Sequence, residues 1–267
     1  MGANTKQLRN RIKSVDSTLH LTKAMGLVAS SKIRRALDGM MKGREYESAV
    51  TRAVEGLLSA PECKKSPYMR VGNGEKTCLV VIAGDRGLAG CYNANIFRIC
   101  KNYPDAHVIP VGKRACDRFK SEILRAEDFT YAVAIGLATE LCREFAAGEY
   151  DRVGIVCTKY RSMMLQEAEV RFLLPLEEKA ADSLAGTVFE PDELTVLNEI
   201  VPEYVAGILV SAVRESFACE VAARRTAMDS AGKNAQQMID GLQLAYNRAR
   251  QSAITQEITE IVAGSGS

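Results

Sequence analysis

Apolar and small residues at the start of the chain recur in alternating steps of four and three positions. The run is Leu8, Ile12, Val15, Leu19, Thr22, Gly26, Ala29, Ile33, Ala36 and Met40, and it resumes at Val50, Val54 and Leu57. A mean period of 3.5 residues is typical of helices that pack along each other in a left-handed coiled coil. Gly26 indicates crowding in this seam, because glycine costs about 1 kcal/mol relative to alanine in a helix.

The end of the chain repeats the pattern with smaller residues. Its run is Val205, Leu209, Ala212, Ser216, Cys219 and Ala223, then four-residue steps through Ala227, Ala231 and Ala235, then Met238, Leu242, Ala245 and Ala249. Such a slip locally unwinds a coiled coil. The small residues match those in the middle of the first run, which favours antiparallel pairing of the two ends within one chain. A coiled coil between chains is the alternative.

All seven prolines lie between residues 61 and 202. Proline lacks an N–H and clashes with the preceding helical turn, so the proline-free ends support two long helices. We expect three parts: a coiled-coil helix over residues 1–60, a Rossmann-like α/β domain over 61–190, and a coiled-coil helix with its tip over 191–267. Asp192 can cap the last helix, and Pro202 is expected to interrupt or kink it.

Short apolar, β-branched segments alternate with helical ones in the middle of the chain. Strands are predicted at residues 77–83, 107–111, 152–158 and 170–174. Helices are predicted around 95–99, from Gly112 to about 123, and over 134–147. The fold class is therefore α/β: a long antiparallel coiled coil of the terminal helices plus a small, doubly wound sheet domain.

A glycine-rich turn follows the first predicted strand and raises the question of nucleotide binding. Its glycines, Gly84, Gly87 and Gly90, do not have the G-x-G-x-x-G spacing of dinucleotide-binding turns. Asp85 would place a negative charge where a phosphate should lie. The serine, histidine and carboxylate positions form no catalytic spacing either. We expect no catalytic residues, no metal and no cofactor, and keep a nucleotide-dependent enzyme only as an alternative.

An apolar stripe lies near the C-terminus, at Ile254, Ile258, Ile261 and Val262. If the last helix is longer than its partner, this stripe has no partner within the chain and predicts a contact surface for another protein. The alternative is that the stripe folds back into a core.

The charge is unevenly distributed. Net charge is only +2, yet residues 1–60 carry eleven Lys or Arg against five Asp or Glu. This excess is either a solvated helix face or a docking surface for acidic protein, lipid or nucleic acid. The eight cysteines form no C-x-x-C pair, which favours reduced, cytosolic thiols over a zinc site. No 18-residue apolar run is found, so we expect no segment to span a membrane.

Three segments together resemble the gamma subunit of F-type (F1Fo) ATP synthases, bacterial type. The first comprises residues 9–15, 21–25 and 28–35, the second is Asp85-Arg86-Gly87-Leu88, and the third comprises residues 226–231 and 246–262. The resemblance covers nearly the whole chain. It departs from the family pattern at Gly26, where a charged or larger residue is usual.

The resemblance implies a non-catalytic central-stalk rotor subunit of a proton-transporting two-sector ATPase, which couples transmembrane ion (proton) flow to ATP synthesis or hydrolysis. The implied partners are the hexameric ring of alpha and beta subunits, the epsilon subunit and the membrane c-ring, with one copy per complex and no nucleic acid. The implied place is the cytoplasmic side of the cell inner membrane, as a peripheral protein. The implied partner-binding residues are Met25, Arg224, Arg250, Gln251, Thr255, Ile254, Ile258 and Ile261. The alternative function is a coiled-coil adaptor or nucleic-acid-binding protein.

Overall fold

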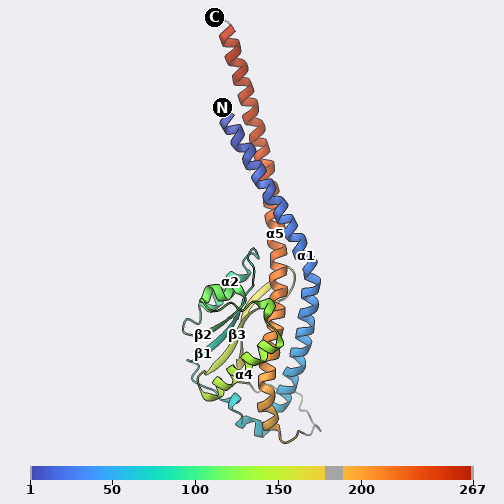
Figure 1. Cartoon of the computed structure of the whole chain (residues 1–267), viewed down its shortest axis with the longest axis vertical. Coiled ribbons are helices and arrows are strands. Elements are labelled where there is room, and N and C mark those ends of the chain that lie inside the picture. The colour runs from blue at the N-terminus through green and yellow to red at the C-terminus, as the bar shows by residue number, and fades with distance from the viewer. Residues whose placement is uncertain (1, 178–188, 266–267) are drawn as a thin grey trace. The chain divides into compact units, whose positions relative to one another are not determined.

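The computed structural model describes residues 2–177 and 189–265 and divides into two compact units. The paired-helix unit takes residues 1–31 and 224–267, and the α/β unit takes residues 32–223. Helices α1 (Gly2–Leu58) and α5 (Glu193–Ser265) each contribute to both units (Figure 1). The predicted class, two long terminal helices plus a small sheet domain, is confirmed. The three-part division of the chain at residues 60 and 190 stays a prediction.

The α/β unit is built on four strands, in the order β2-β1-β3-β4. Strands β1 (Thr77–Ile82), β2 (His107–Val111) and β3 (Arg152–Tyr160) are parallel, and β4 (Gln166–Leu174) pairs antiparallel with β3 at the edge. All six residues of β1 are buried, because this central strand is covered on both faces. All four predicted strands are present, and β3 and β4 are longer than expected.

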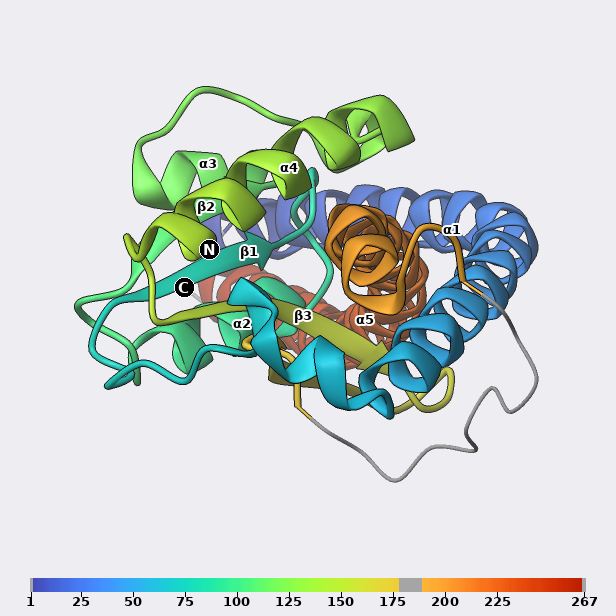
Figure 2. The ribbon, with the colours of Figure 1, turned by 90° about the horizontal axis from the view of Figure 1, so that it is seen from below.

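Helices cover the two faces of the sheet in the manner of a doubly wound fold. Helix α2 (Tyr92–Cys100) connects β1 to β2, and α3 (Lys113–Phe119) and α4 (Tyr131–Ala147) lead from β2 back to β3. The chain passes from β1 to β2 on one side of the sheet and then back past β1 to β3 on the other side. Since both crossovers are right-handed, these opposite directions place α2 and α4 on opposite faces of the sheet (Figure 2). Three short 3-10 turns, Pro61–Lys65, Pro67–Met69 and Ala126–Asp128, complete the connections.

Two apolar cores result from this arrangement. One contains Val80 and Ile82 of β1, packed with α4, the end of α1 and the first part of α5. The other contains Leu79 and Val81, whose side chains point to the opposite face and pack against α2. The alternation of strand residues between the two cores shows that both faces of the sheet are needed to exclude water.

Helix α5 begins as predicted but does not break where expected. The carboxylate of Asp192 accepts hydrogen bonds from the backbone N–H of Thr195 (2.8 Å) and from its hydroxyl (2.8 Å), as a helix cap does. The interruption expected at Pro202 is wrong, since α5 continues through this residue. Packing is the physical reason: Leu197, Val201 and Val205 on either side are fully buried in the core.

Among the described residues, α5 is the helix long and apolar enough to cross a membrane by composition. Its most apolar 18-residue window has a mean hydropathy of 1.5, and 61% of that window is buried inside the molecule. The sequence prediction that no such segment exists overlooked this window, because isolated charged residues interrupt it. The burial is what a core helix shows.

Candidate functional site

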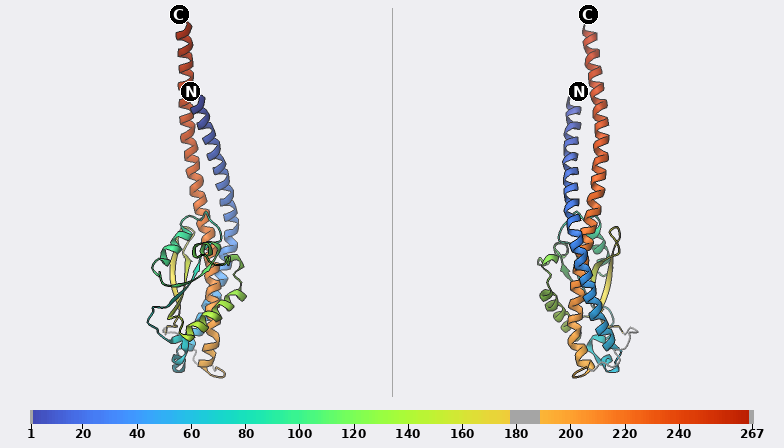
Figure 3. Two further views of the ribbon diagram at one scale, coloured as in Figure 1. Left: turned by 60° about the vertical axis from the view of Figure 1, so that its left-hand side comes forward. Right: turned by 90° about the vertical axis from the view of Figure 1, so that its right-hand side faces the viewer.

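The paired-helix unit joins the first half of α1 and the last part of α5 in an antiparallel pair (Figure 3). A methyl group added at Gly26 would lie 3.6 Å from Met228 Cβ, and one added at Gly232 would lie 3.6 Å from Thr22 Oγ1. In both pairs the two residue numbers add up to 254, and this sum defines the register: a residue of α1 faces the residue of α5 that completes the sum. The cluster of Leu19 with Ala235, and of Val15 with Ile239, keeps the same relation.

This register confirms the predicted α1 seam and corrects the α5 seam. Leu19, Thr22 and Ala29 of α1 are buried, as the four-three pattern requires. On α5, however, Ile239 is buried and Met238 is 48% exposed. Tyr246 is half-buried and Ala245 is exposed, so the expected seam is off by one residue at these two positions, whereas Ala235, Leu242 and Ala249 face α1 as predicted. Facing positions from Met228 to Ala249 keep alternating steps of four and three, so the predicted slip at Ala227–Ala235 is wrong.

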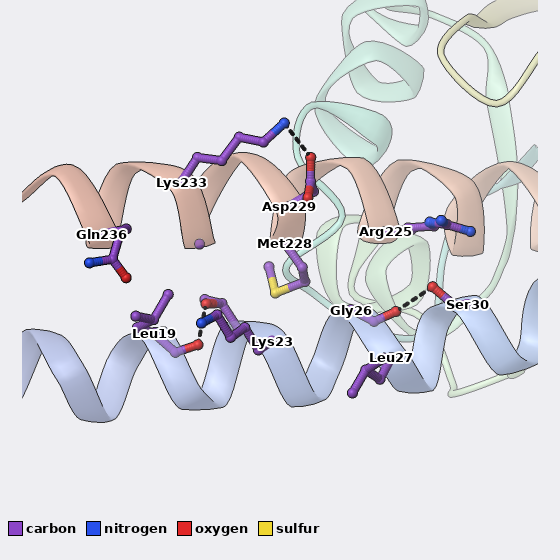
Figure 4. A pocket seen from close by; sticks show the side chains of 12 residues that line it. Leu19, Lys23, Gly26, Leu27, Ser30, Arg225, Met228, Asp229, Lys233 and Gln236 are labelled. Carbon is purple, nitrogen blue, oxygen red and sulfur yellow. Dashed lines mark hydrogen bonds and ion pairs between the residues drawn. The ribbon is translucent and has the colours of Figure 1, made fainter.

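Gly26 borders an open groove instead of a crowded contact (Figure 4). The groove has a volume of about 520 Å³ and is lined by α1 residues such as Leu19 and Leu27 and by α5 residues such as Met228. Since an added methyl group would make an ordinary contact at 3.6 Å, the expectation that Gly26 relieves crowding is wrong.

The Gly26→Ala variant is therefore expected to unfold at a higher temperature, with a gain of about 0.5–1 kcal/mol, because glycine loses more backbone entropy than alanine in a helix. Thermal unfolding followed by circular dichroism checks this. Gly43→Ala is the matched control: its methyl group would lie 3.3 Å from Ser211 Cα, on backbone that does not yield easily. Equal gains at both positions would contradict the distinction.

The last turns of α5 extend beyond α1. By the same register, Gly2 at the start of α1 faces residue 252. Beyond that point Ile254, Ile258 and Ile261 are 47%, 56% and 70% exposed, and Val262 is exposed as well. The alternative that these residues fold back into a core is wrong for the described chain.

The exposed stripe does not continue the seam that faces α1. Continued in steps of three and four, the seam would pass through Ala253, Gln256 and Glu260. The Gln256 amide donates a 3.0 Å hydrogen bond to the Glu260 carboxylate. At 100° per residue, Ile254, Ile258 and Ile261 lie within an arc of about 60° on a different face. The tip is thus a separate apolar surface with polar groups beside it.

The residues expected to bind partners form two groups. Arg250, Gln251 and Thr255 are exposed on α5 beside the three isoleucines, so six of the eight lie within about three turns of one helix. Met25 on α1 and Arg224 on α5 are half-buried. They lie near one another by the register, since position 224 faces position 30. About 39 Å of helix separates Arg224 from Arg250. The eight residues do not form one site.

In the α/β unit, the glycine-rich turn after β1 is closed by Asp85. One carboxylate oxygen accepts hydrogen bonds from the backbone N–H groups of Lys113 (2.9 Å) and Ala126 (3.0 Å), and the other accepts one from Glu127 (3.1 Å). Asp85 thus ties the turn after β1 to the start of α3 and to the 3-10 turn Ala126–Asp128.

The crevice at the carboxyl edge of the sheet is also filled. In doubly wound folds, ligands bind where the strand order reverses, here between the ends of β1 and β3. Helix α5 lies at this point: the Cys219 thiol donates to Thr158 O (3.5 Å), and the Tyr92 hydroxyl donates to Ser216 O (3.1 Å). The seam pattern alone does not predict this role of α5. The available signal was the presence of charged residues, Arg214, Glu215 and Glu220, within a mostly apolar stretch.

All eight cysteines are free thiols in the structure. Burial raises the pKa of Cys78, Cys142 and Cys157 to about 12, so these thiols stay protonated at neutral pH. Cys91 is exposed and Cys100 is half-buried. Within residues 2–177 and 189–265, no three His, Cys, Asp or Glu side chains are grouped to hold a metal ion.

Comparison with known proteins gives the family. A family model described as ATP synthase matches residues 4–267. The ATP synthase gamma chain of Ruminococcus albus is 39% identical over 287 residues, which cover 98% of this chain and 98% of that protein. The chain belongs to the ATP synthase gamma chain family. Another gamma chain, described as sodium ion specific, comes from Acetobacterium woodii and is 35% identical over 99% of this chain and 98% of its own length.

Solved structures share the fold of this gamma chain family member. A chain from the rotor of the Euglena gracilis mitochondrial ATP synthase has a TM-score of 0.68 and 20% identity, over 95% of this chain and all of that one. A chain from the Tetrahymena thermophila mitochondrial ATP synthase, in a structure described as central stalk and c-ring, has a TM-score of 0.62 and 22% identity, over 79% of this chain and 99% of that one.

Proposed function

We propose that this gamma chain is the central rotor shaft of an F-type ATP synthase and couples transmembrane flow of H⁺ or Na⁺ to ATP synthesis and hydrolysis. Family membership over 98% of the chain is the observation that carries the proposal. The extension of α5 beyond α1 supports it, because a shaft that turns inside a ring needs a tip whose contacts are all with other subunits.

The partners are the alpha and beta subunits, which form the ring around the shaft, and the epsilon subunit and c-ring at its foot. One gamma chain serves one ring. These partners tie the chain to the cytoplasmic side of the cell inner membrane as a peripheral protein. Solved relatives described as rotor, or as central stalk and c-ring, support this arrangement.

The exposed tip of α5 is the surface on which the ring acts. Ile254, Ile258 and Ile261 offer a narrow apolar face that slides in an apolar sleeve, since apolar contacts lack the directionality that would hold one angle. Arg250 beside them forms charge-assisted bonds with carboxylates of the ring at particular angles. Gln251 and Thr255 add neutral hydrogen bonds at the same level.

Met25 and Arg224 form a second contact, lower on the shaft. Both are half-buried, so each offers only part of its side chain to a partner. The Arg224 guanidinium suits an acidic loop of a beta or alpha subunit, and Met25 adds an adaptable apolar contact.

The chain itself performs no chemistry in this proposal. Asp85 places a negative charge in the turn where a phosphate would bind, and α5 lies in the crevice where a doubly wound fold binds its ligand. ATP therefore binds and reacts on the ring, and this chain changes the shape of those sites by turning.

The test is reconstitution with the cognate alpha and beta subunits. ATPase activity is measured with and without this chain, and co-elution is checked on the same sample. One copy per ring together with raised turnover supports the shaft. A chain that neither co-elutes nor changes ATPase activity overturns the proposal. Salt-dependent binding of DNA by the chain alone would favour the nucleic-acid alternative.

Ile258→Asp is expected to lower the ATPase activity of the reconstituted complex by about tenfold, because it places a charge in an apolar sleeve at a cost of more than about 1.4 kcal/mol. Ile258 is exposed in the chain itself, so its own unfolding temperature should change little. Thr259→Asp is the matched control: it adds the same charge one residue further, away from the arc of the isoleucines. Equal losses in the two variants would contradict the placement of the stripe.

A further inference from the structure

Two carboxylates of α5 accept hydrogen bonds from the main chain of the sheet domain. Glu215 Oε1 accepts one from the backbone N–H of Tyr160, the last residue of β3, at 2.7 Å. Glu220 Oε1 accepts one from the backbone N–H of Arg86, in the glycine-rich turn after β1, at 3.3 Å. The two strand ends at the crevice thus each donate to one carboxylate of the same helix.

The two carboxylates mark the edges of the helix face that contacts the domain. At 100° per residue, Glu215 and Glu220 are about 140° apart around α5 and about 7.5 Å apart along it. Ser216 and Cys219, whose contacts with Tyr92 and Thr158 are described above, lie between them. A rotation of α5 in either direction would therefore pull one of the two carboxylates away from its donor.

Each carboxylate has a further close neighbour: Arg44 lies beside Glu215, and Gly84 lies beside Glu220. The Arg44 guanidinium of α1 binds Glu215 through two nitrogens, at 2.5 and 3.5 Å, and also donates to Tyr160 O at 3.0 Å. This pairing raises the pKa of Arg44, chiefly through the hydrogen bond to Glu215. The Glu220 carboxylate lies close against Gly84, where an added methyl group would be 2.7 Å from its carboxyl carbon.

The rest of this helix face makes apolar contacts and neutral hydrogen bonds. By the same angular spacing, the buried α5 residues between the two carboxylates include Ile208, Leu209 and Ala212, beside Ser216 and Cys219. Apolar contacts are not directional. Hydrogen bonds to charged acceptors are stronger than neutral ones and depend on geometry, so they can hold one angle.

We propose that Glu215 and Glu220 are positioning residues that fix the rotational setting of α5 against the sheet domain, so that torque passes between the domain and the helix without slip. This inference rests on the proposed function and names the part of the rotor that transmits the force. Arg44 completes it by attaching α1 to the same carboxylate. Slip matters only when the shaft turns against a load, and this condition separates a lock from a merely stabilising contact.

The test uses the complete enzyme, with its membrane sector, in sealed vesicles supplied with ATP. The variants are Glu215→Ala with Glu220→Ala, and Glu215→Gln with Glu220→Gln, which keeps the size of both side chains. ATP hydrolysis is measured with an uncoupler present, and the steady ion gradient is measured without it. Glu167→Gln is the control, because it removes an exposed ion pair with Arg161 in the β3–β4 hairpin.

With the uncoupler, both double variants are expected to hydrolyse ATP like the parent. Without it, the gradient that they sustain should be lower by about threefold or more, since the charge-assisted bonds that resist slip are lost or weakened. The control should match the parent in both measurements. An unchanged gradient, or a fall in gradient and hydrolysis in equal proportion, overturns the inference. A parent enzyme that sustains no gradient overturns the proposed function instead.

Discussion

Gly112→Ala is expected to lower the unfolding temperature by about 10 °C, since a loss of more than about 4 kcal/mol corresponds to a shift of this size in a chain of this length. Gly112 has a φ of +93°, a backbone conformation that side chains rarely adopt. A methyl group there would lie 2.0 Å from Ala83 O. That carbonyl cannot move away, because the Ala83 N–H bonds Val111 O at 2.9 Å and the Gly112 N–H bonds Leu124 O at 2.7 Å.

Gly136→Ala is the control for the same chemical change without a clash. Gly136 lies inside α4, and nothing is within 4 Å of an added methyl group. Alanine there should stabilise the protein by about 0.5–1 kcal/mol through helix propensity. Thermal unfolding of both variants under one buffer condition checks the pair. A Gly112→Ala variant as stable as the parent would show that the turn after β2 is not held as described.

Asp85→Asn is expected to lower the free energy of unfolding by about 3 kcal/mol, because hydrogen bonds to charged acceptors contribute about 1.5–3 kcal/mol each and are not additive. The carboxylate accepts three backbone N–H groups, on Lys113, Ala126 and Glu127. An asparagine amide can accept on one side only, so its NH₂ group would face at least one N–H donor. Urea unfolding followed by circular dichroism measures the loss.

Asp117→Asn gives the comparison for removal of a carboxylate alone. Asp117 pairs with Lys113 at 3.0 Å within one helix, and both side chains are exposed. Such a pair contributes no more than about 0.5 kcal/mol. If the two asparagine variants lost the same stability, the three backbone bonds to Asp85 would have no special weight.

The difference between the two seams shows what periodicity can establish. On α1, large residues such as Leu19, Ile33 and Met40 alternate with charged ones, so the buried face was predicted to the residue. On α5, alanine occurs on several faces between residues 222 and 249, and neither size nor polarity separates one line from the next. Ile239 is buried instead of Met238 because it packs against α1. The pattern of α5 alone holds no information about that contact.

The sheet was predictable because its signals are local. Short runs of apolar residues marked all four strands, and β3 and β4 differ only in being longer than predicted. Helix α5 passed Pro202 because the burial of neighbouring residues outweighs the missing hydrogen bond. Proline lowers the stability of a helix locally, but tertiary packing determines whether the helix ends at that residue.

The contacts in the crevice could not be predicted in the same way. Arg44, Tyr160 and Glu215 are far apart in sequence, and Glu220 meets a turn more than 130 residues before it. Glu215 and Glu220 stand out in a mostly apolar stretch, but the sequence does not indicate which groups they bind. The isoleucine stripe at the tip, in contrast, could be recognised from the sequence. Its exposure then followed from the length of α5 and from the register with α1.

Occupation of the crevice by α5 has a consequence for how the chain is made. All four strands precede residue 193, whereas the helix that fills the crevice is completed only near the end of synthesis. Until then the strand ends carry donors without acceptors and an apolar edge open to water. The sheet therefore reaches its final state late, after residue 220 has left the ribosome, and a chain cut short before α5 would expose a surface prone to aggregation.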